Sequence, residues 1–307
     1  MYKNKNLSVV IFAFGFMGKH SFQGLKKNKN LSIKGIIVPK LNKYYYSNIK
    51  LNKINNKIKI LKSDKKNQIY NFIKNLKPDV VLISTFNKIF EKKILKLSKF
   101  INIHHGRLPK QKGRASINWA ILMGRKSIYL TFHQVISKLD SGKIILQKKI
   151  SIKKNDNYQT IQMKIGNYIQ MNISKIILDY LKDKIKLKKN DKKNETWNCS
   201  RNPEDSLINF FKKRKDIHNL IRACKDKTFG AFCYLREKKI IIMETSINTK
   251  RKYEGIIPGR ITQIHRNGDV DCLCKDGPIT IKKIFYKNKI ISPSKIIKST
   301  RDTLLND

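Results

Sequence analysis

The chain has 307 residues, which is long enough for two domains, and its 40% hydrophobic content excludes a disordered protein. Lysine and arginine total 68 against 21 acidic residues, for a formal net charge of +47. Such a charge suggests a polyanionic partner such as nucleic acid. However, the excess is mostly lysine, is accompanied by abundant asparagine and isoleucine, and is spread over nearly every segment. We therefore favour compositional drift over a selected polyanion-binding surface.

Cysteine usage and hydropathy further narrow the class of protein to which the chain can belong. The five cysteines have no regular spacing, which argues against a disulfide scaffold and favours a reducing, cytoplasmic compartment. Cys272 and Cys274 lack an accompanying histidine pattern, so no metal site is expected. No apolar run in the sequence approaches the roughly 20 residues of a membrane span, so no membrane insertion is expected.

The first two thirds of the chain alternate between strand and helix patterns. Strands are predicted at residues 7–14, 33–38, 58–61, 79–86, 100–104 and 129–136, and helices at residues 18–29, 63–76, 91–99, 115–123 and 156–188. Ser63 or Asp64 is expected to cap the second helix, and residues 40–57 are expected to form an irregular loop. An isoleucine stripe along the last helix is predicted to pack into the core: Ile161, Ile165, Ile169, Ile173, Ile176 and Ile177. This alternation is typical of a Rossmann-like α/β domain with a parallel sheet.

A second region begins near Trp197. From residue 235 onward, short strands separated by Asn267-Gly268 and Asp276-Gly277 turns predict a small antiparallel β-barrel. We therefore expect an α/β domain over residues 1–195 and a C-terminal barrel domain over residues 206–307.

Polar side chains interrupt the apolar strand predicted at residues 100–104. Asn102 and His104 alternate with isoleucines, so both face the same side of the strand, whereas His105 faces the other side and is interpreted as structural. Two polar groups on one face of an apolar strand are costly unless they are hydrogen-bonded. The carboxyl end of a strand is also where α/β folds place their sites, so this pair is a candidate functional site.

Three further segments carry possible chemistry. The loop from Lys110 to Arg114 is basic and contains Gly113, so it could bind an anion or simply connect two elements. Asp140 lies in a predicted turn, where an aspartate is usually structural, and only its pairing with Asn102 and His104 favours a functional role. Gly15 and Gly18 form an incomplete dinucleotide fingerprint, which argues against NAD but allows a phosphate at the helix N-terminus.

These motifs resemble the formyltransferase family that uses 10-formyltetrahydrofolate, whose pattern is Asn-x-His-x-Ser-Leu-Leu-Pro, then Arg-Gly, then Asp-x-Gly. The chain has Asn102-Ile-His104, Leu108-Pro109, Lys112-Gly113 and Asp140-Ser-Gly142 in this order. The resemblance covers nearly the whole chain and includes Arg201-Asn-Pro-Glu-Asp205, Ile217-His-Asn-Leu-Ile-Arg222 and Gly230-Ala-Phe232. It implies a Rossmann-like formyltransferase domain followed by an OB-like barrel.

The resemblance also implies roles for individual residues. His104 would accept or relay the proton of the acceptor amine, Asn102 would donate a hydrogen bond to the developing formyl oxyanion, and Asp140 would orient the imidazole. The formyl-folate co-substrate is expected near Ser84, Phe86, Lys88, Leu139 and Gly142. No metal cofactor is implied.

The chain departs from the family pattern at four places. Gly106-Arg107 stands for the usual Ser-Leu, Lys112 for Arg, Tyr129 for a Gly before Leu-Thr, and Ser116 for a common Pro. These departures line the loops around the site, so they bear on substrate geometry.

Two branches of the family compete for the identity of the acceptor. One formylates amino sugars carried on nucleotides, and the other formylates methionyl-tRNA. Gly113-Arg-Ala-Ser-Ile-Asn-Trp119 and Thr131-Phe-His133 resemble the sugar branch, which we favour, whereas the net charge favours tRNA. An inactive binding module is an alternative of another class, and the sequence leaves the oligomeric state open. Residues expected to contact the acceptor are Gly15, Lys110, Gly113, Arg114 and Arg201, although Arg201 could instead pair with Asp205.

Overall fold

The structure is a computed structural model that describes residues 6–40, 57–86, 88–227, 229–247 and 251–305. The chain divides into two compact units. The first comprises residues 1–116, 127–151 and 162–198, and the second comprises residues 117–126, 152–161 and 199–307. Within the described ranges, no helix is both long and apolar enough to cross a membrane. The expected domain limits of 1–195 and 206–307 stay a prediction.

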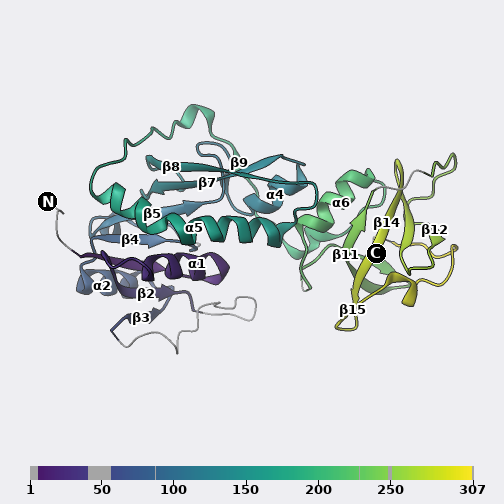
Figure 1. Ribbon diagram of the computed structural model, residues 1–307, viewed down its shortest axis with the longest axis horizontal. Helices are drawn as coiled ribbons and strands as arrows, with labels where there is room; N and C mark the ends of the chain where they lie inside the picture. The colour runs from purple at the N-terminus through teal and green to yellow at the C-terminus, as the bar shows by residue number, and fades with distance from the viewer. Residues whose placement is uncertain (1–5, 41–56, 87, 228, 248–250, 306–307) are drawn as a thin grey trace. The chain divides into compact units, whose positions relative to one another are not determined.

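A seven-stranded sheet forms the centre of the first unit, in the order β3-β2-β1-β4-β5-β7-β8 (Figure 1). Its strands are β1 (Leu7–Phe12), β2 (Leu31–Val38), β3 (Lys59–Lys62), β4 (Val80–Ile83), β5 (Lys99–His104), β7 (Ser127–Gln134) and β8 (Ile144–Ser151). The first five pair in parallel, as predicted, but β7 and β8 are antiparallel. The predicted Rossmann-like α/β fold is therefore confirmed, with a mixed sheet in place of a purely parallel one.

Helices cover both faces of this sheet (Figure 1). They are α1 (Gly15–Lys26), α2 (Lys66–Leu76), α3 (Lys92–Leu95) and α5 (Tyr158–Leu181), whereas α4 (Ser116–Leu122) belongs almost entirely to the second unit. Strand β1 is buried throughout, and its Val10 and Phe12 pack with Ile69 and Ile73 of α2. The predicted isoleucine stripe of α5 is buried, which confirms its role in the core. Apolar residues on both faces of a strand are what a sheet covered on two sides requires.

Several predicted boundaries shift. Helix α2 begins at Lys66, and its N-cap residue is Lys65, whose side chain makes no capping hydrogen bond. The predicted cap Ser63 lies two residues before this position, and its hydroxyl accepts the Lys65 N–H at 3.0 Å. The strand predicted at residues 79–86 is shortened to β4, and the helix predicted at residues 91–99 to α3. Strand β8 was not expected from the sequence. Most of the predicted loop at residues 40–57 lies outside the described residues.

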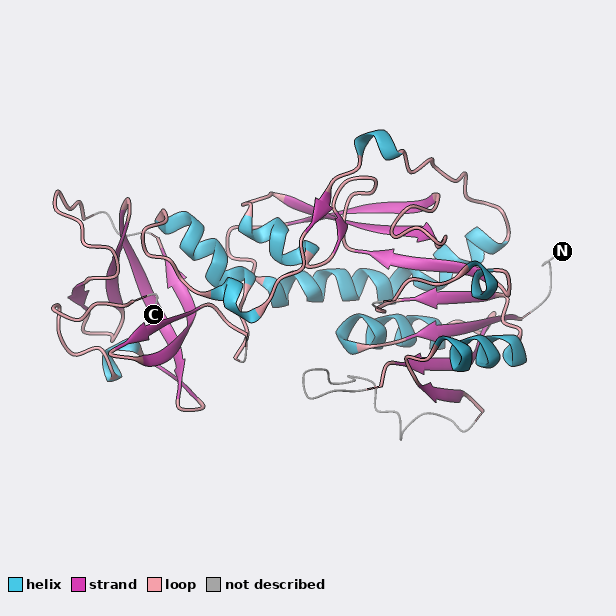
Figure 2. Ribbon diagram, turned by 180° about the vertical axis from the view of Figure 1, so that it is seen from behind, coloured by secondary structure: helices cyan, strands magenta, loops and turns pink. Residues whose placement is uncertain are grey.

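The second unit contains an antiparallel sheet that curls on itself (Figure 2), as the predicted barrel requires. The strand order is β10-β11-β14-β13-β12, with β15 on β14. The strands are β10 (Phe232–Leu235), β11 (Lys238–Ser246), β12 (Ile261–Ile264), β13 (Val270–Cys274), β14 (Gly277–Tyr286) and β15 (Lys289–Ile291). Helix α6 (Arg214–Ala223) packs against β11 and β14. The predicted turns contain Gly268 at φ +88° and Gly277 at φ +123°, angles that glycine adopts readily.

Gly24 of α1 allows a close approach to α5. A Cβ atom at this position would lie 2.6 Å from the carbonyl oxygen of Gln170 and 2.6 Å from Cγ2 of Ile173. We expect Gly24→Ala to lower the free energy of unfolding by about 1–3 kcal/mol, because overpacking forces the two helices apart. Gly255→Ala is the control, since its Cβ would meet nothing within 4 Å, and should change stability by less than about 0.5 kcal/mol. Equal stabilities in urea denaturation would contradict this packing.

Candidate active site

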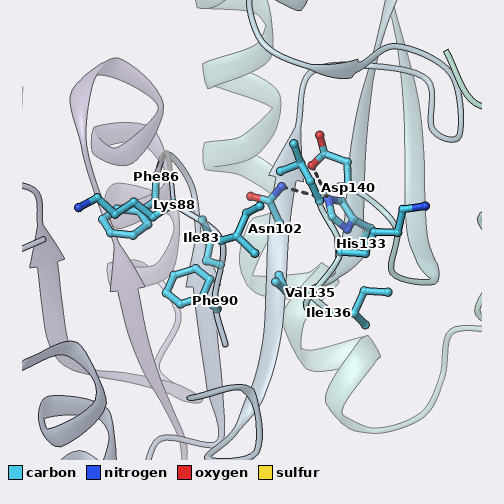
Figure 3. A pocket seen from close by; sticks show the side chains of 12 residues that line it. Ile83, Phe86, Lys88, Phe90, Asn102, His133, Val135, Ile136 and Asp140 are labelled. Atoms are coloured by element: carbon cyan, nitrogen blue, oxygen red, sulfur yellow. Dashed lines mark hydrogen bonds and ion pairs between the residues drawn. The ribbon is translucent and has the colours of Figure 1, made fainter. Parts of the chain in front are cut away.

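Four polar side chains converge at one edge of the first unit's sheet, and Figure 3 shows three of them, Asn102, His133 and Asp140. Asn102 and His104 come from β5, His133 comes from the neighbouring β7, and Asp140 comes from the turn between β7 and β8. His104 Nδ1 lies 3.5 Å from Asp140 Oδ2, and His133 Nε2 lies 3.6 Å from Asp140 Oδ1. Both histidines and the aspartate are buried. The three residues predicted from the sequence are thus brought together, and His133 joins them.

Hydrogen bonds fix the orientation of the Asn102 amide. His133 Nδ1 lies 2.7 Å from the carbonyl oxygen of Gln134, which can only accept, so Nδ1 carries a proton. The other ring nitrogen, Nε2, then accepts a hydrogen bond from Asn102 Nδ2 at 3.0 Å. Since an amide nitrogen carries two hydrogens, Asn102 can donate one to His133 and the other to a bound oxygen.

Gly106 allows His104 to reach its backbone partner. His104 Nε2 donates to the carbonyl oxygen of Gln111 at 2.7 Å. A Cβ atom on Gly106 would lie 2.5 Å from that nitrogen and 2.6 Å from that oxygen. The serine that is usual at this position would therefore collide with the hydrogen bond, so glycine is required by this loop conformation.

Burial dominates the electrostatics of the site. Burial lowers the pKa of His104 below 6.5, and it outweighs the opposing effect of the neighbouring Asp140 carboxylate. Burial would by itself raise the pKa of Asp140, but His133, His104 and the Gly113 N–H together hold that pKa below its usual value. The Gly113 N–H donates to Asp140 Oδ2 at 3.1 Å. At neutral pH the site therefore contains an uncharged His104 beside an ionised Asp140.

Strand β6 (Lys112–Gly113) pairs with β9 (Trp197–Asn198) and carries a lysine with no exposed surface. Lys112 Nζ lies 2.7 Å from Glu195 Oε2, 3.0 Å from the Ser141 hydroxyl and 5.4 Å from the ring centre of Trp197. The same two-residue strand thus provides the Gly113 N–H that binds Asp140 and the Lys112 ammonium group that binds the neighbouring Ser141. Lys112, which stands for the arginine of the family pattern, is thus a buried cation next to the turn that carries Asp140.

A pocket of about 400 Å³, counting its open mouth, adjoins Asn102, His133 and Asp140. Figure 3 shows its wall of mostly apolar side chains, which includes Ile83, Phe86, Phe90, Val135 and Ile136. Among the residues expected to contact the folate, Phe86, Lys88 and Leu139 line this pocket.

Ser84 and Gly142 are not among the residues that line the pocket. The Ser84 hydroxyl is buried and lies 2.7 Å from the Ser21 hydroxyl. A Cβ atom on Gly142 would come within 1.9 Å of the carbonyl oxygen of Gln134, so glycine is needed where the turn meets β7. The geometry thus gives both residues a supporting position behind the site.

The residues expected to contact the acceptor are more dispersed. Gly15 begins α1 with φ +60°, Gly113 donates to Asp140, and Arg114 is exposed beside it. Lys110 lines a second pocket of about 820 Å³, counting its open mouth. Arg201 belongs to the second unit, where it donates to the carbonyl oxygen of Asp205 at 2.6 Å and lies 5.5 Å from the ring centre of Trp119.

Sequence reasoning missed the groups that support the predicted trio. His133 could have been found from its place on β7, but only with the antiparallel register that sets it opposite Asn102. Asn190 donates to the carbonyl oxygens of Asp140 and Gly142 at 2.9 and 3.0 Å, and no local signal marks it. Over the described part of the chain, no cluster of histidine, cysteine or acidic residues could hold a metal ion.

The Lys112–Glu195 pair leads to a stability prediction. Glu195→Gln leaves the fully buried ammonium group without its carboxylate, so we expect a clear drop in Tm. Lys112→Met should cost less, because the remaining Glu195 side chain is 25% exposed and can be hydrated. The double variant should recover part of the loss seen with Glu195→Gln. Thermal unfolding measures all three, and a larger loss for Lys112→Met than for Glu195→Gln would contradict this electrostatic account.

Comparisons with known proteins agree with the architecture of both units. The formyl transferase family model matches residues 18–173, and the model for the formyl transferase C-terminal domain matches residues 201–301. The bifunctional polymyxin resistance protein ArnA of Wigglesworthia glossinidia brevipalpis is 30% identical over 210 residues, which cover 67% of this chain and 32% of that protein. The chain thus matches about a third of that relative's length.

A further relative is named for methionyl-tRNA, and a similar solved structure contains a nucleotide-linked amino sugar. The methionyl-tRNA formyltransferase of Malacoplasma penetrans is 29% identical over 250 residues, covering 80% of this chain and 76% of that protein. The N-formyltransferase of Helicobacter canadensis, solved with folinic acid and dTDP-3-aminofucose, superposes with a TM-score of 0.65 at 20% identity, covering 89% of this chain and 97% of that one. On the match of its family model to more than half of its residues, the chain belongs to the formyl transferase family.

Proposed function

We propose that this protein transfers a formyl group from 10-formyltetrahydrofolate to the primary amine of a nucleotide-linked amino sugar. The observation that carries the proposal is the convergence of Asn102, His104 and Asp140, with His133, beside an apolar pocket. An amide donor, a neutral imidazole and an ionised carboxylate are the groups that acyl transfer to an amine requires.

His104 acts as the base. Its lowered pKa keeps the ring neutral near pH 7, and because Nε2 donates to Gln111, the lone pair lies on Nδ1. A proton taken up from the acceptor amine at Nδ1 is held beside Asp140 Oδ2, 3.5 Å away. Asp140 therefore stabilises the imidazolium without becoming protonated itself, as its lowered pKa favours.

Asn102 stabilises the oxygen of the transferred group. When the amine nitrogen bonds to the formyl carbon, the carbonyl oxygen gains negative charge, and an oriented N–H donor lowers the energy of that state. His133 holds the Asn102 amide in the donating orientation through the 3.0 Å bond to Nδ2. The bond from the formyl carbon to the carrier nitrogen then breaks, and that nitrogen takes up a proton.

The pocket beside these residues fits the donor. Its apolar wall, with Phe86 and Phe90, suits a flat heteroaromatic ring, and Asn102 and Asp140 provide polar atoms at one side. In this proposal Phe86, Lys88 and Leu139 contact the folate, while Ser84 and Gly142 shape the loops behind it.

The acceptor is proposed from the composition of the second pocket and from the relatives. Lys110 lines a pocket that also contains Arg107 and Lys189, and cations of this kind suit a diphosphate. The Helicobacter canadensis enzyme was solved with a dTDP-amino sugar. The second candidate acceptor is methionyl-tRNA, which the Malacoplasma penetrans relative and the net charge of +47 favour.

A formylation assay that offers Met-tRNA and a panel of UDP- and dTDP-amino sugars side by side separates the two acceptors. We expect product from an amino sugar and none from Met-tRNA. His104→Ala should lower kcat/KM by about 10²–10⁴-fold while the protein remains folded, because the base is lost. Product from Met-tRNA alone would overturn the sugar proposal, and no product from any acceptor would favour an inactive binding module.

The pH dependence of kcat/KM tests the electrostatics. Activity needs neutral His104, so it falls as the pH drops through the pKa of that residue, which burial places below 6.5. Asp140 raises the pKa of His104 and Lys112 lowers it, so Asp140→Asn should shift the acid limb to lower pH and Lys112→Met to higher pH. Shifts in the same direction, or an acid limb above pH 6.5 in the wild type, would exclude His104 as the titrating base.

A further inference from the structure

Arg107 and Tyr129 form a stacked pair in the first unit. The guanidinium carbon of Arg107 lies 5.0 Å from the centre of the Tyr129 ring. The backbone N–H of Arg107 also donates to Gln111 Oε1 at 3.2 Å. An arginine that is held on an aromatic face loses less side-chain entropy when its N–H groups bind a ligand. The guanidinium group of Arg107, with its forked pair of N–H donors, is therefore preorganised, although the residue is exposed.

Arg107 lines a pocket with a positive lining. Arg107, Lys110 and Lys189 contribute three cations against the single carboxylate of Asp191, with Leu108, Pro109, Gln147 and Asn194 completing the wall. Asp191 Oδ1 accepts the backbone N–H of Lys193 at 3.1 Å, which caps the short 3₁₀ helix Lys192–Asn194. One wall is rigid, because Gln147 Nε2 donates to the carbonyl oxygen of Leu108 at 2.8 Å and lies 3.1 Å from the Thr131 hydroxyl.

The pocket is connected to the candidate active site through one residue. The carbonyl oxygen of Gln111 accepts from His104 Nε2, and the side-chain oxygen of the same residue accepts from the Arg107 backbone. A ligand bound by Arg107 would therefore lie on the loop that also positions His104.

Both members of the pair depart from the family pattern, which has leucine and glycine at these positions. A glycine at position 129 would offer no ring for Arg107, and a leucine at position 107 would offer no charge. The two departures therefore make physical sense together, as a single unit that adds a bidentate donor at this place.

We propose that Arg107, stacked on Tyr129, binds a phosphate of the acceptor's diphosphate and so helps to select nucleotide-linked substrates. The inference rests on the proposed function for the identity of the ligand. The binding chemistry itself follows from the fork of Arg107, which can donate two parallel hydrogen bonds to one phosphate, and from the two lysines that line the same pocket.

Titration with inorganic pyrophosphate at physiological salt tests the subsite without any formyl transfer. We expect Arg107→Leu to weaken binding about tenfold or more, because a charge-assisted bidentate contact is lost. Arg107→Lys should recover only part of the affinity, since lysine has no planar fork. Arg301→Leu is the matched control, an exposed arginine of the second unit, and should bind like the wild type. Equal affinities for Arg107→Leu and Arg301→Leu would overturn the proposal.

A double-mutant cycle tests the pair. Tyr129→Phe should retain affinity because the ring remains, whereas Tyr129→Ala should weaken pyrophosphate binding several-fold. In the Arg107→Leu background, Tyr129→Ala should have almost no further effect, because the ring acts through the arginine. Additive losses would show that Tyr129 acts independently and would overturn the stacked-pair account.

The outcomes separate this subsite from the proposed function. Pyrophosphate binding that depends on Arg107, in a protein that formylates no amino sugar, would uphold the subsite and reject the proposed acceptor. If Arg107→Leu weakens binding of Met-tRNA but leaves pyrophosphate binding unchanged, the diphosphate assignment is overturned in favour of a nucleic-acid phosphate.

Discussion

The buried carboxylate of Asp140 is the group on which the arrangement of the site depends. A charge out of contact with water is tolerated only when hydrogen bonds and opposite charges surround it. The Gly113 N–H donates to one of its oxygens, and Asn190 fixes the turn from behind. His104 Nδ1 lies 3.5 Å from the same oxygen and becomes an opposite charge when it takes up a proton. The positive φ of 46° at Asp140 directs the side chain inward against this set of partners. The loop that carries Gly113 and the turn that carries Asp140 are therefore held together by the solvation of one anion.

Local pattern was enough to predict the elements that provide Asn102 and His104, because alternation on a strand fixes which side chains share a face. Asp140 could be assigned only through the resemblance, since an aspartate in a turn has many structural uses. His133 was missed because its role depends on the antiparallel register of β7 against β5, and the strand pattern predicted a parallel sheet. Supports such as Asn190 come from distant segments, where no periodicity connects them to the site.

The departures from the family pattern are explained by contacts. Gly106 makes room for the bond between His104 and Gln111, and the Ser116 hydroxyl accepts from Asn198 Nδ2 at 3.2 Å. Lys112 finds its carboxylate in Glu195, and Arg107 stacks on Tyr129. Changes that look scattered along the sequence are thus paired in space, each with a partner that accommodates it.

The two-residue pairing of β6 with β9 has a consequence for how the first unit can be divided. The segment after α5 provides Asn190 to the Asp140 turn, Glu195 to Lys112, and Thr196 to the backbone of Gln111 and Lys112. A fragment that ends with α5 would contain Asn102, His104, His133 and Asp140 and still lack the segment that holds their loops. Exchange of these loops between related proteins would accordingly have to transfer residues 105–116 and 190–198 together, as one module that is discontinuous in the gene but continuous in space.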